Sequence, residues 1–170
     1  MGANRIGFGS VIPTGKGRLN RQLVFTAAQK KIFLEKITKY KLKYPEIRIA
    51  TEDPLKFSIC TRTWDFGEFN YRNPRFLGGC SAGIITINIL SDGTITPCSM
   101  LLKPIVNIKN KTPQEILKAY TSSKIIHNLI ERKIKGKCSF CELKRLCGGC
   151  RAVADGICND YLAADPTCWK

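Results

Sequence analysis

The strongest constraint in this sequence is a set of four cysteines within thirteen residues. They follow the spacing C-x2-C-x5-C-x2-C and are Cys138, Cys141, Cys147 and Cys150. Two thiolates two residues apart can bind one soft metal centre, because a tight turn brings both sulfurs to the same side. Gly148 and Gly149 lie between the last two cysteines, and without a Cβ they let the backbone bend closely. The pattern predicts a metal centre near the C-terminal end of the chain.

The chain has nine cysteines in 170 residues, so disulfides and buried free thiols are the alternatives to metal binding. The residues after Met1 contain no apolar signal segment, and no apolar run reaches the 18 residues of a membrane span. We therefore expect a cytoplasmic protein without a membrane partner. Thiols are kept reduced in that compartment, which favours metal ligation over disulfides.

The formal net charge of +15 raises the question of nucleic-acid binding. That count treats every cysteine as neutral, whereas ligating thiolates are anionic, and two four-iron clusters with their ligands would lower it by about 4. The lysines are spread along the chain and form no basic stripe with interleaved aromatics. We expect no nucleic-acid partner.

The first 55 residues have the pattern of a β/α unit. Residues 5–8 and 47–51 are predicted strands, and Thr26 is a predicted N-cap for a helix over 27–44. Phe33, Ile37, Tyr40 and Tyr44 are its predicted apolar face. A lone unit of this kind cannot bury both faces of its sheet, so it indicates docking onto a larger α/β body.

A β-hairpin is predicted farther along, with strands over 84–90 and 94–98 joined by an Asp92-Gly93 turn of two residues. Cys80 precedes the hairpin and Cys98 ends it, so the two thiols form a predicted half-site. Thr112, Pro113 and Glu115 together signal a helix start. His127, the single histidine, is predicted to be a surface residue on a second short helix.

Zinc and iron–sulfur clusters are the two candidate metals. A zinc ribbon separates its C-x2-C pairs by about 15–20 residues, whereas the gap here is five residues. The spacing also differs from the C-x2-C-x2-C-x3-C-P run of bacterial ferredoxins. Nine thiols exceed the eight that two fully ligated cubane clusters require, which favours two iron–sulfur clusters over one zinc.

The order Cys80, Gly93-x4-Cys98, then Cys138 to Cys150, then Cys168 resembles the SPASM domain of radical SAM maturases. That family's pattern is C-x9-15-G-x4-C, a gap, C-x2-C-x5-C-x3-C, a gap and C. This chain departs by one residue, with two residues instead of three between Cys147 and Cys150. The Cys147-Gly-Gly-Cys150-Arg-Ala run is similar to SPASM proteins related to the haem-pathway and tungsten-cofactor maturases. The resemblance covers about residues 78–170.

The resemblance implies two auxiliary [4Fe–4S] clusters that transfer electrons or engage a peptide, protein or cofactor substrate. The first would be held by Cys80, Cys98 and Cys150. The second would be held by Cys138, Cys141, Cys147 and Cys168. Cys60 and Cys158 are candidate extra ligands, and a substrate group on an open iron position is a third candidate for the first cluster. A structural zinc module that binds a macromolecule and a simple electron carrier are the rival functions.

The start of the chain resembles a late strand and loop of the radical SAM partial barrel. The C-x3-C-x2-C motif that binds the S-adenosylmethionine-cleaving cluster does not occur in this sequence. The resemblance therefore implies that S-adenosylmethionine and the radical SAM core act from the same longer polypeptide or from a neighbouring one. We expect an α+β fold. It would comprise a β/α remnant of that barrel (1–55), an irregular linker (56–79) and a SPASM domain with a β-hairpin and short helices around two clusters (80–170).

Overall fold

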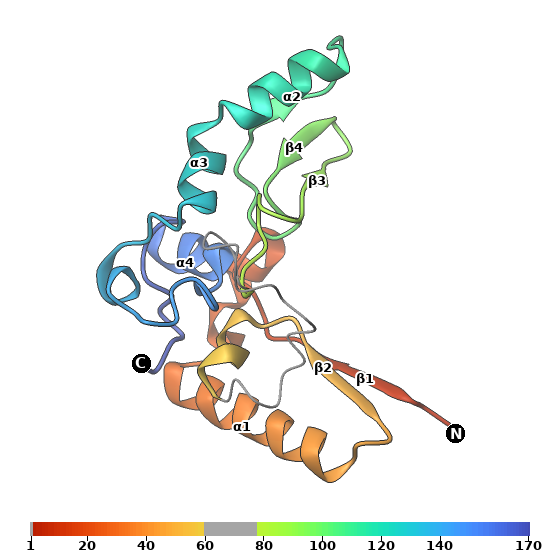
Figure 1. The fold of residues 1–170 in the computed structure, drawn as a ribbon, viewed down its shortest axis with the longest axis vertical. Coiled ribbons are helices and arrows are strands. Elements are labelled where there is room, and N and C mark those ends of the chain that lie inside the picture. The colour runs from red at the N-terminus through yellow and green to blue at the C-terminus, as the bar shows by residue number, and fades with distance from the viewer. Residues whose placement is uncertain (1, 60–77) are drawn as a thin grey trace.

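The computed structural model describes residues 2–59 and 78–170, and the linker positions 60–77 lie outside this description. Helices and small sheets are mixed along the chain, which is compatible with the predicted α+β class (Figure 1). The strands are β1 (Arg5–Phe8), β2 (Arg48–Thr51), β3 (Asn88–Ile89), β4 (Thr94–Thr96) and β5 (Val106–Asn107). The helices are α1 (Ala27–Lys43), α2 (Pro113–Thr121), α3 (Lys124–Ile130) and α4 (Arg151–Cys158), with short 3-10 helices η1 (Gly15–Leu23), η2 (Pro54–Ser58) and η3 (Gly136–Ser139).

The predicted β/α unit is present at one end of the molecule. β1 and β2 pair in parallel, with Arg5 opposite Arg48, and α1 connects them and packs against β2. Thr26 caps α1 as predicted, because its hydroxyl accepts the Gln29 N–H, and the Thr26 N–H donates to the Gln29 side-chain oxygen. Because β1 and β2 run in parallel, their carboxyl ends lie at the same edge of the sheet.

The buried face of α1 agrees only in part with the predicted one, since Ile37 is buried as predicted. Lys30, Leu34, Ile37 and Thr38 are buried, whereas Tyr40 is 48% exposed and stacks on Tyr44 at the surface. The buried face is therefore rotated about the helix axis relative to the predicted face. The burial of Lys30 has a tertiary cause, because its ammonium pairs with Asp53, a residue that follows β2.

The second sheet is antiparallel, in the order β3-β4-β5, and lies at the opposite end of the molecule beside α2 (Figure 1). The predicted first strand is much shorter than expected, because residues 81–86 curl into a turn in which Ser81 O accepts three backbone N–H groups. The loop also differs. Four residues, 90–93, connect the strands, with Leu90 N–H bonded to Thr94 O and Gly93 at φ +88°, instead of the predicted two-residue turn.

The helix prediction around residue 112 is correct. Thr112 and Glu115 form a capping box at the start of α2, and α3 follows after a short break. His127 lies exposed on α3, as expected. Within the described residues, no helix combines the length and the apolar character that crossing a membrane requires.

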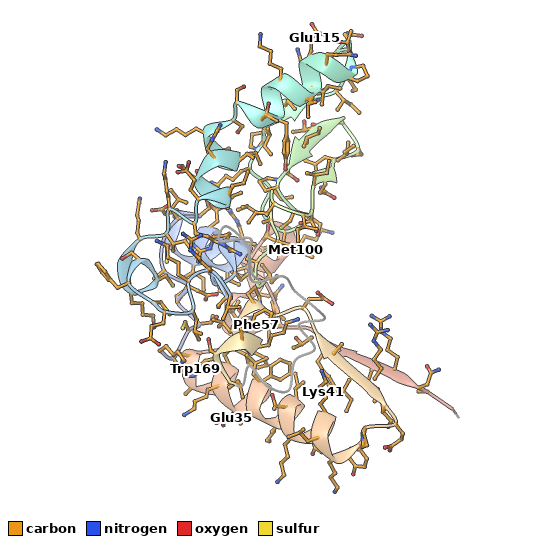
Figure 2. The ribbon with its side chains drawn as sticks, viewed as in Figure 1. Glu35, Lys41, Phe57, Met100, Glu115 and Trp169 are labelled. Atoms are coloured by element: carbon orange, nitrogen blue, oxygen red, sulfur yellow. The ribbon has the colours of Figure 1, made fainter. Side chains whose placement is uncertain are left out.

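Two buried hydrophobic clusters hold the elements together. The first joins α1 and β2 to the C-terminal segment and includes Leu34, Ile37, Leu55, Cys147 and Cys168. Figure 2 shows Phe57 and Trp169 on this side of the molecule, near α1. The second contains Ala82, Leu101, Leu129 and Ala152, with Ile12 from the N-terminal loop packed against it. Both clusters therefore combine residues from the β/α unit with residues from the cysteine-rich part.

Candidate metal centres

The described cysteines are free thiols, and most of them fall into two groups. The first group consists of Cys80, Cys98 and Cys150, all half-buried and packed against the second hydrophobic cluster. They come from three separate elements, since Cys80 precedes β3, Cys98 follows β4 and Cys150 is the N-cap of α4. Together they line a cavity of about 540 Å³. Figure 2 shows Met100, another lining residue, at the middle of the molecule.

Backbone N–H groups point at the sulfurs of the first group. The Cys98 Sγ accepts the N–H of Met100 at 3.4 Å and of Leu101 at 3.2 Å. Burial raises the pKa of Cys98, and these two N–H groups oppose that rise. Burial also raises the pKa of Cys150, against the N–H groups of Val153 and Ala152 in the first turn of α4. The N–H groups favour the thiolate form of these cysteines, whereas burial disfavours it. A bound metal cation would restore the balance toward the thiolate.

The second group consists of Cys138, Cys147 and Cys168, and all three are buried. Cys147 and Cys168 belong to the hydrophobic cluster that includes α1. Burial raises the pKa of Cys147 to about 12. The Gly149 N–H, 3.3 Å from the Cys147 Sγ, opposes this rise, whereas the nearby thiols of Cys168 and Cys138 increase it. Cys141 is half-buried and lies three residues after Cys138 along the chain.

Gly148 and Gly149 separate the two groups. Both have left-handed backbone angles, φ +67° and +57°, which favour glycine. A Cβ on Gly149 would lie 2.7 Å from the Cβ of Asp165, so a side chain would not fit there. Cys147 thus lies with the second group, whereas Cys150, three residues later, lies with the first.

Asp165 connects the C-terminal segment to this bend, a role that our sequence reasoning did not assign to it. The side chain is fully buried, and its Oδ2 accepts the Cys150 N–H at 2.7 Å. Its Oδ1 accepts the N–H and the hydroxyl of Thr167. The Asp-Pro-Thr sequence signals a local turn of this kind, although it does not reveal the distant partner Cys150.

The basic residues beside the cysteines occupy different environments. Arg151 is buried, and its Nη1 donates to the carbonyls of Tyr161 at 2.9 Å and Ala163 at 2.7 Å. Lys137 is exposed and donates to the carbonyl of Cys168. Arg145 is exposed, and Lys144 is half-buried. Arg132, which the sequence analysis did not single out, is buried beside both groups.

The remaining candidate ligands lie apart from the two groups or outside the description. Cys158 is exposed at the end of α4, about 12 Å along the helix axis from the Cys150 position. Cys60 lies outside the described residues.

The cavity at the first group has a second wall, made by the ends of the parallel strands. Ser10 follows β1, Asp53 follows β2, and both line the cavity. Asp53 forms a buried ion pair with Lys30, whose ammonium also donates to the Ser10 hydroxyl at 2.7 Å. The strand ends of the β/α unit and the first cysteine group therefore face one cavity.

The donor chemistry of these groups suits an iron–sulfur cluster. In residues 2–59 and 78–170, no three His, Cys, Asp or Glu side chains are arranged to hold a metal ion. A single zinc would need thiolates about 2.3 Å from one point, whereas thiolates of a cluster each bind a different iron and stand farther apart. Buried thiols that receive backbone N–H groups provide the ligand type and hydrogen bonds that tune such clusters.

Sequence comparison finds relatives named AdoMet-dependent heme synthase. The chain is 34% identical to the one from Methanosarcina barkeri over 91 residues, which are 53% of this chain and 25% of that relative. It is 32% identical over 90 residues to the one from Nitratidesulfovibrio vulgaris (24% of its length) and 30% identical over 91 residues to the one from Oleidesulfovibrio alaskensis (23%). No family model and no solved structure matches the chain. About half of this chain is thus homologous to a segment that makes up about a quarter of the length of these relatives. Their name states a dependence on S-adenosylmethionine.

Proposed function

We propose that this chain carries two auxiliary [4Fe–4S] clusters for a radical SAM enzyme related to the haem synthases. Cys80, Cys98 and Cys150 hold the first cluster, and Cys138, Cys141, Cys147 and Cys168 hold the second. The observation that carries the proposal is the division of thiols on either side of Gly148-Gly149. Its enzymatic context comes from the similarity to proteins named AdoMet-dependent heme synthase.

The first cluster faces the reacting partner in this proposal. Support comes from the cavity of about 540 Å³, whose lining includes all three thiols of the first group and the strand ends Ser10 and Asp53. The fourth position of this cluster belongs to Cys60 or to a substrate group. Clusters at these two sites would accept and relay single electrons or provide an iron position for a substrate.

The core that cleaves S-adenosylmethionine is supplied by the same polypeptide or a neighbouring one. Support comes from the sequence, which has no C-x3-C-x2-C motif, and from the length of the relatives, of which the match spans about a quarter. The substrate class is a peptide, a protein or a cofactor such as a haem precursor.

Anaerobic reconstitution of the 170-residue chain tests the proposal. We expect a brown protein with roughly eight irons per chain, as two four-iron clusters require. Cys98→Ala and Cys138→Ala should each lower the iron content to roughly four. Cys158→Ser is the matched control, because Cys158 is exposed at the other end of α4 from Cys150, and should retain the full content. A colourless protein with stoichiometric zinc would instead support the zinc-module alternative.

A further inference from the structure

Arg132 lies buried at the point where the two cysteine groups meet. Its side chain is 4% exposed, and its Nη2 donates to the carbonyl of Gly78 at 2.9 Å. Gly78 lies two residues before Cys80, and the Cys80 N–H donates to the carbonyl of Cys147 at 3.0 Å. The guanidinium is therefore held beside a backbone hydrogen bond that joins a thiol residue of each group.

The backbone at Arg132 shows that this placement has a local cost. Arg132 has φ +52° and follows the C-cap of α3. Its N–H bonds to Leu129 O and the next N–H, of Lys133, bonds to Asn128 O, which is the Schellman pattern of a helix end. Glycine is favoured at this left-handed position, so an arginine here is unfavourable unless its side chain makes compensating contacts.

The compensating contacts are with both cysteine groups. Burial lowers the pKa of Arg132, whereas the nearby thiols of Cys80 and Cys147 both favour its positive charge. An added Cβ on Gly148 would lie 1.9 Å from Arg132 Nη1 and 2.6 Å from Cζ. The missing side chain of Gly148 thus leaves the space that the guanidinium fills.

We propose that Arg132 is a positioning residue shared by both cluster sites, whose one buried positive charge compensates the thiolates of the two groups together. A guanidinium suits this role because it stays protonated and presents five donors in a fixed plane. The proposal rests on the proposed function, since the charge of interest is that of thiolates bound to clusters. A positive charge stabilises the reduced, more negative form of a nearby cluster and so raises its reduction potential. Arg132 should therefore raise both potentials.

The test is an EPR-monitored redox titration of the reconstituted 170-residue chain and of three variants. In Arg132→Met we expect the midpoint potentials of both clusters to fall. Arg145→Met is the matched control, because it removes the same charge from an exposed site two residues from Cys147, and its potentials should change much less. Arg132→Lys keeps the charge without the planar fork, and its shifts should be intermediate. A shift confined to one cluster, or equal shifts in the Arg145 control, would overturn the shared role.

The same experiment separates this proposal from the one it rests on. A wild-type chain without eight irons refutes the proposed function, whereas a loaded wild type with unshifted Arg132 variants refutes only the role of Arg132. If Arg132→Met loads no cluster, iron content becomes the readout. Loss of both clusters with an unchanged far-UV circular dichroism spectrum of the apo-protein supports the shared role, and loss of one cluster alone contradicts it.

Discussion

The two cysteine groups offer the same kind of donor atom, a thiol sulfur, but lie in different surroundings. The thiols of the first group are half-buried and line a cavity, whereas Cys138, Cys147 and Cys168 of the second are each at most 9% exposed. The second group also shares its hydrophobic cluster with α1 and β2. One group is thus open to a reacting molecule, and the other is part of the core. Under the proposed function, the first centre would work at the substrate, and the second would mainly support the fold and relay electrons.

The largest expected effect comes from removing a ligand of the core group. In the reconstituted protein, Cys147→Ala should destabilise the chain by at least about 5 kcal/mol, because bound metal contributes directly to folding and structural metal sites reach about 10–16 kcal/mol. Cys98→Ala, at the open group, should lower stability much less. Anaerobic thermal unfolding of both variants measures the difference. Equal losses would remove the distinction between a core centre and an open centre.

The next effect concerns the cavity wall opposite the first group, where Asp53 pairs with Lys30 of α1. Lys30→Met leaves the Asp53 carboxylate buried without its ion-pair partner, and breaking such a pair costs about 3–5 kcal/mol. Lys31→Met is the control, because its pair with Glu35 is about half exposed and contributes about 0.5 kcal/mol or less. Urea unfolding followed by circular dichroism compares the two. A small effect of Lys30→Met would mean that the cavity wall tolerates the lone carboxylate.

A smaller effect is expected where the backbones of the two groups touch. Gly79 has φ +74°, and an added Cβ would lie 2.0 Å from the Cys147 carbonyl oxygen. Gly79→Ala should therefore cost about 1–3 kcal/mol and broaden the EPR signals of both clusters. Gly7→Ala is the matched control, because nothing lies within 4 Å of its added Cβ. Perturbation of a single signal would show that the groups are independent.

The smallest effect is at an exposed ion pair in the segment before Cys168. Lys135 lowers the pKa of Asp160, with the Leu162 N–H adding to the shift. Because the folded-state pKa is depressed, the contribution is present above the ordinary pKa of about 4 and is lost as the pH falls through the lowered value. Asp160→Asn should abolish this part of the acid dependence, worth about 0.5 kcal/mol or less at such exposure. Thermal unfolding between pH 7 and pH 3 tests it.

Local signals in the sequence predicted the elements that depend on neighbouring residues. The capping boxes at Thr26 and Thr112 begin α1 and α2, because each is completed within four residues. The spacing around Gly148-Gly149 predicted a bend between Cys147 and Cys150, because two residues without Cβ permit backbone angles that others avoid. The parallel strand pair followed from the strand–helix–strand order.

Only the tertiary structure decided which distant groups meet. Lys30 is buried because it pairs with Asp53, which lies 23 residues later in the sequence. The residue pattern of α1 does not reveal this partner. The Arg132 guanidinium reaches the carbonyl of Gly78 across 54 positions and occupies a helix end where glycine is expected, so local propensity argued against it. The cysteine order by itself supplied the candidate metal ligands. The burial of one group and the openness of the other depend on packing between segments far apart in the chain, because the exposure of a thiol is set by the surfaces that cover it.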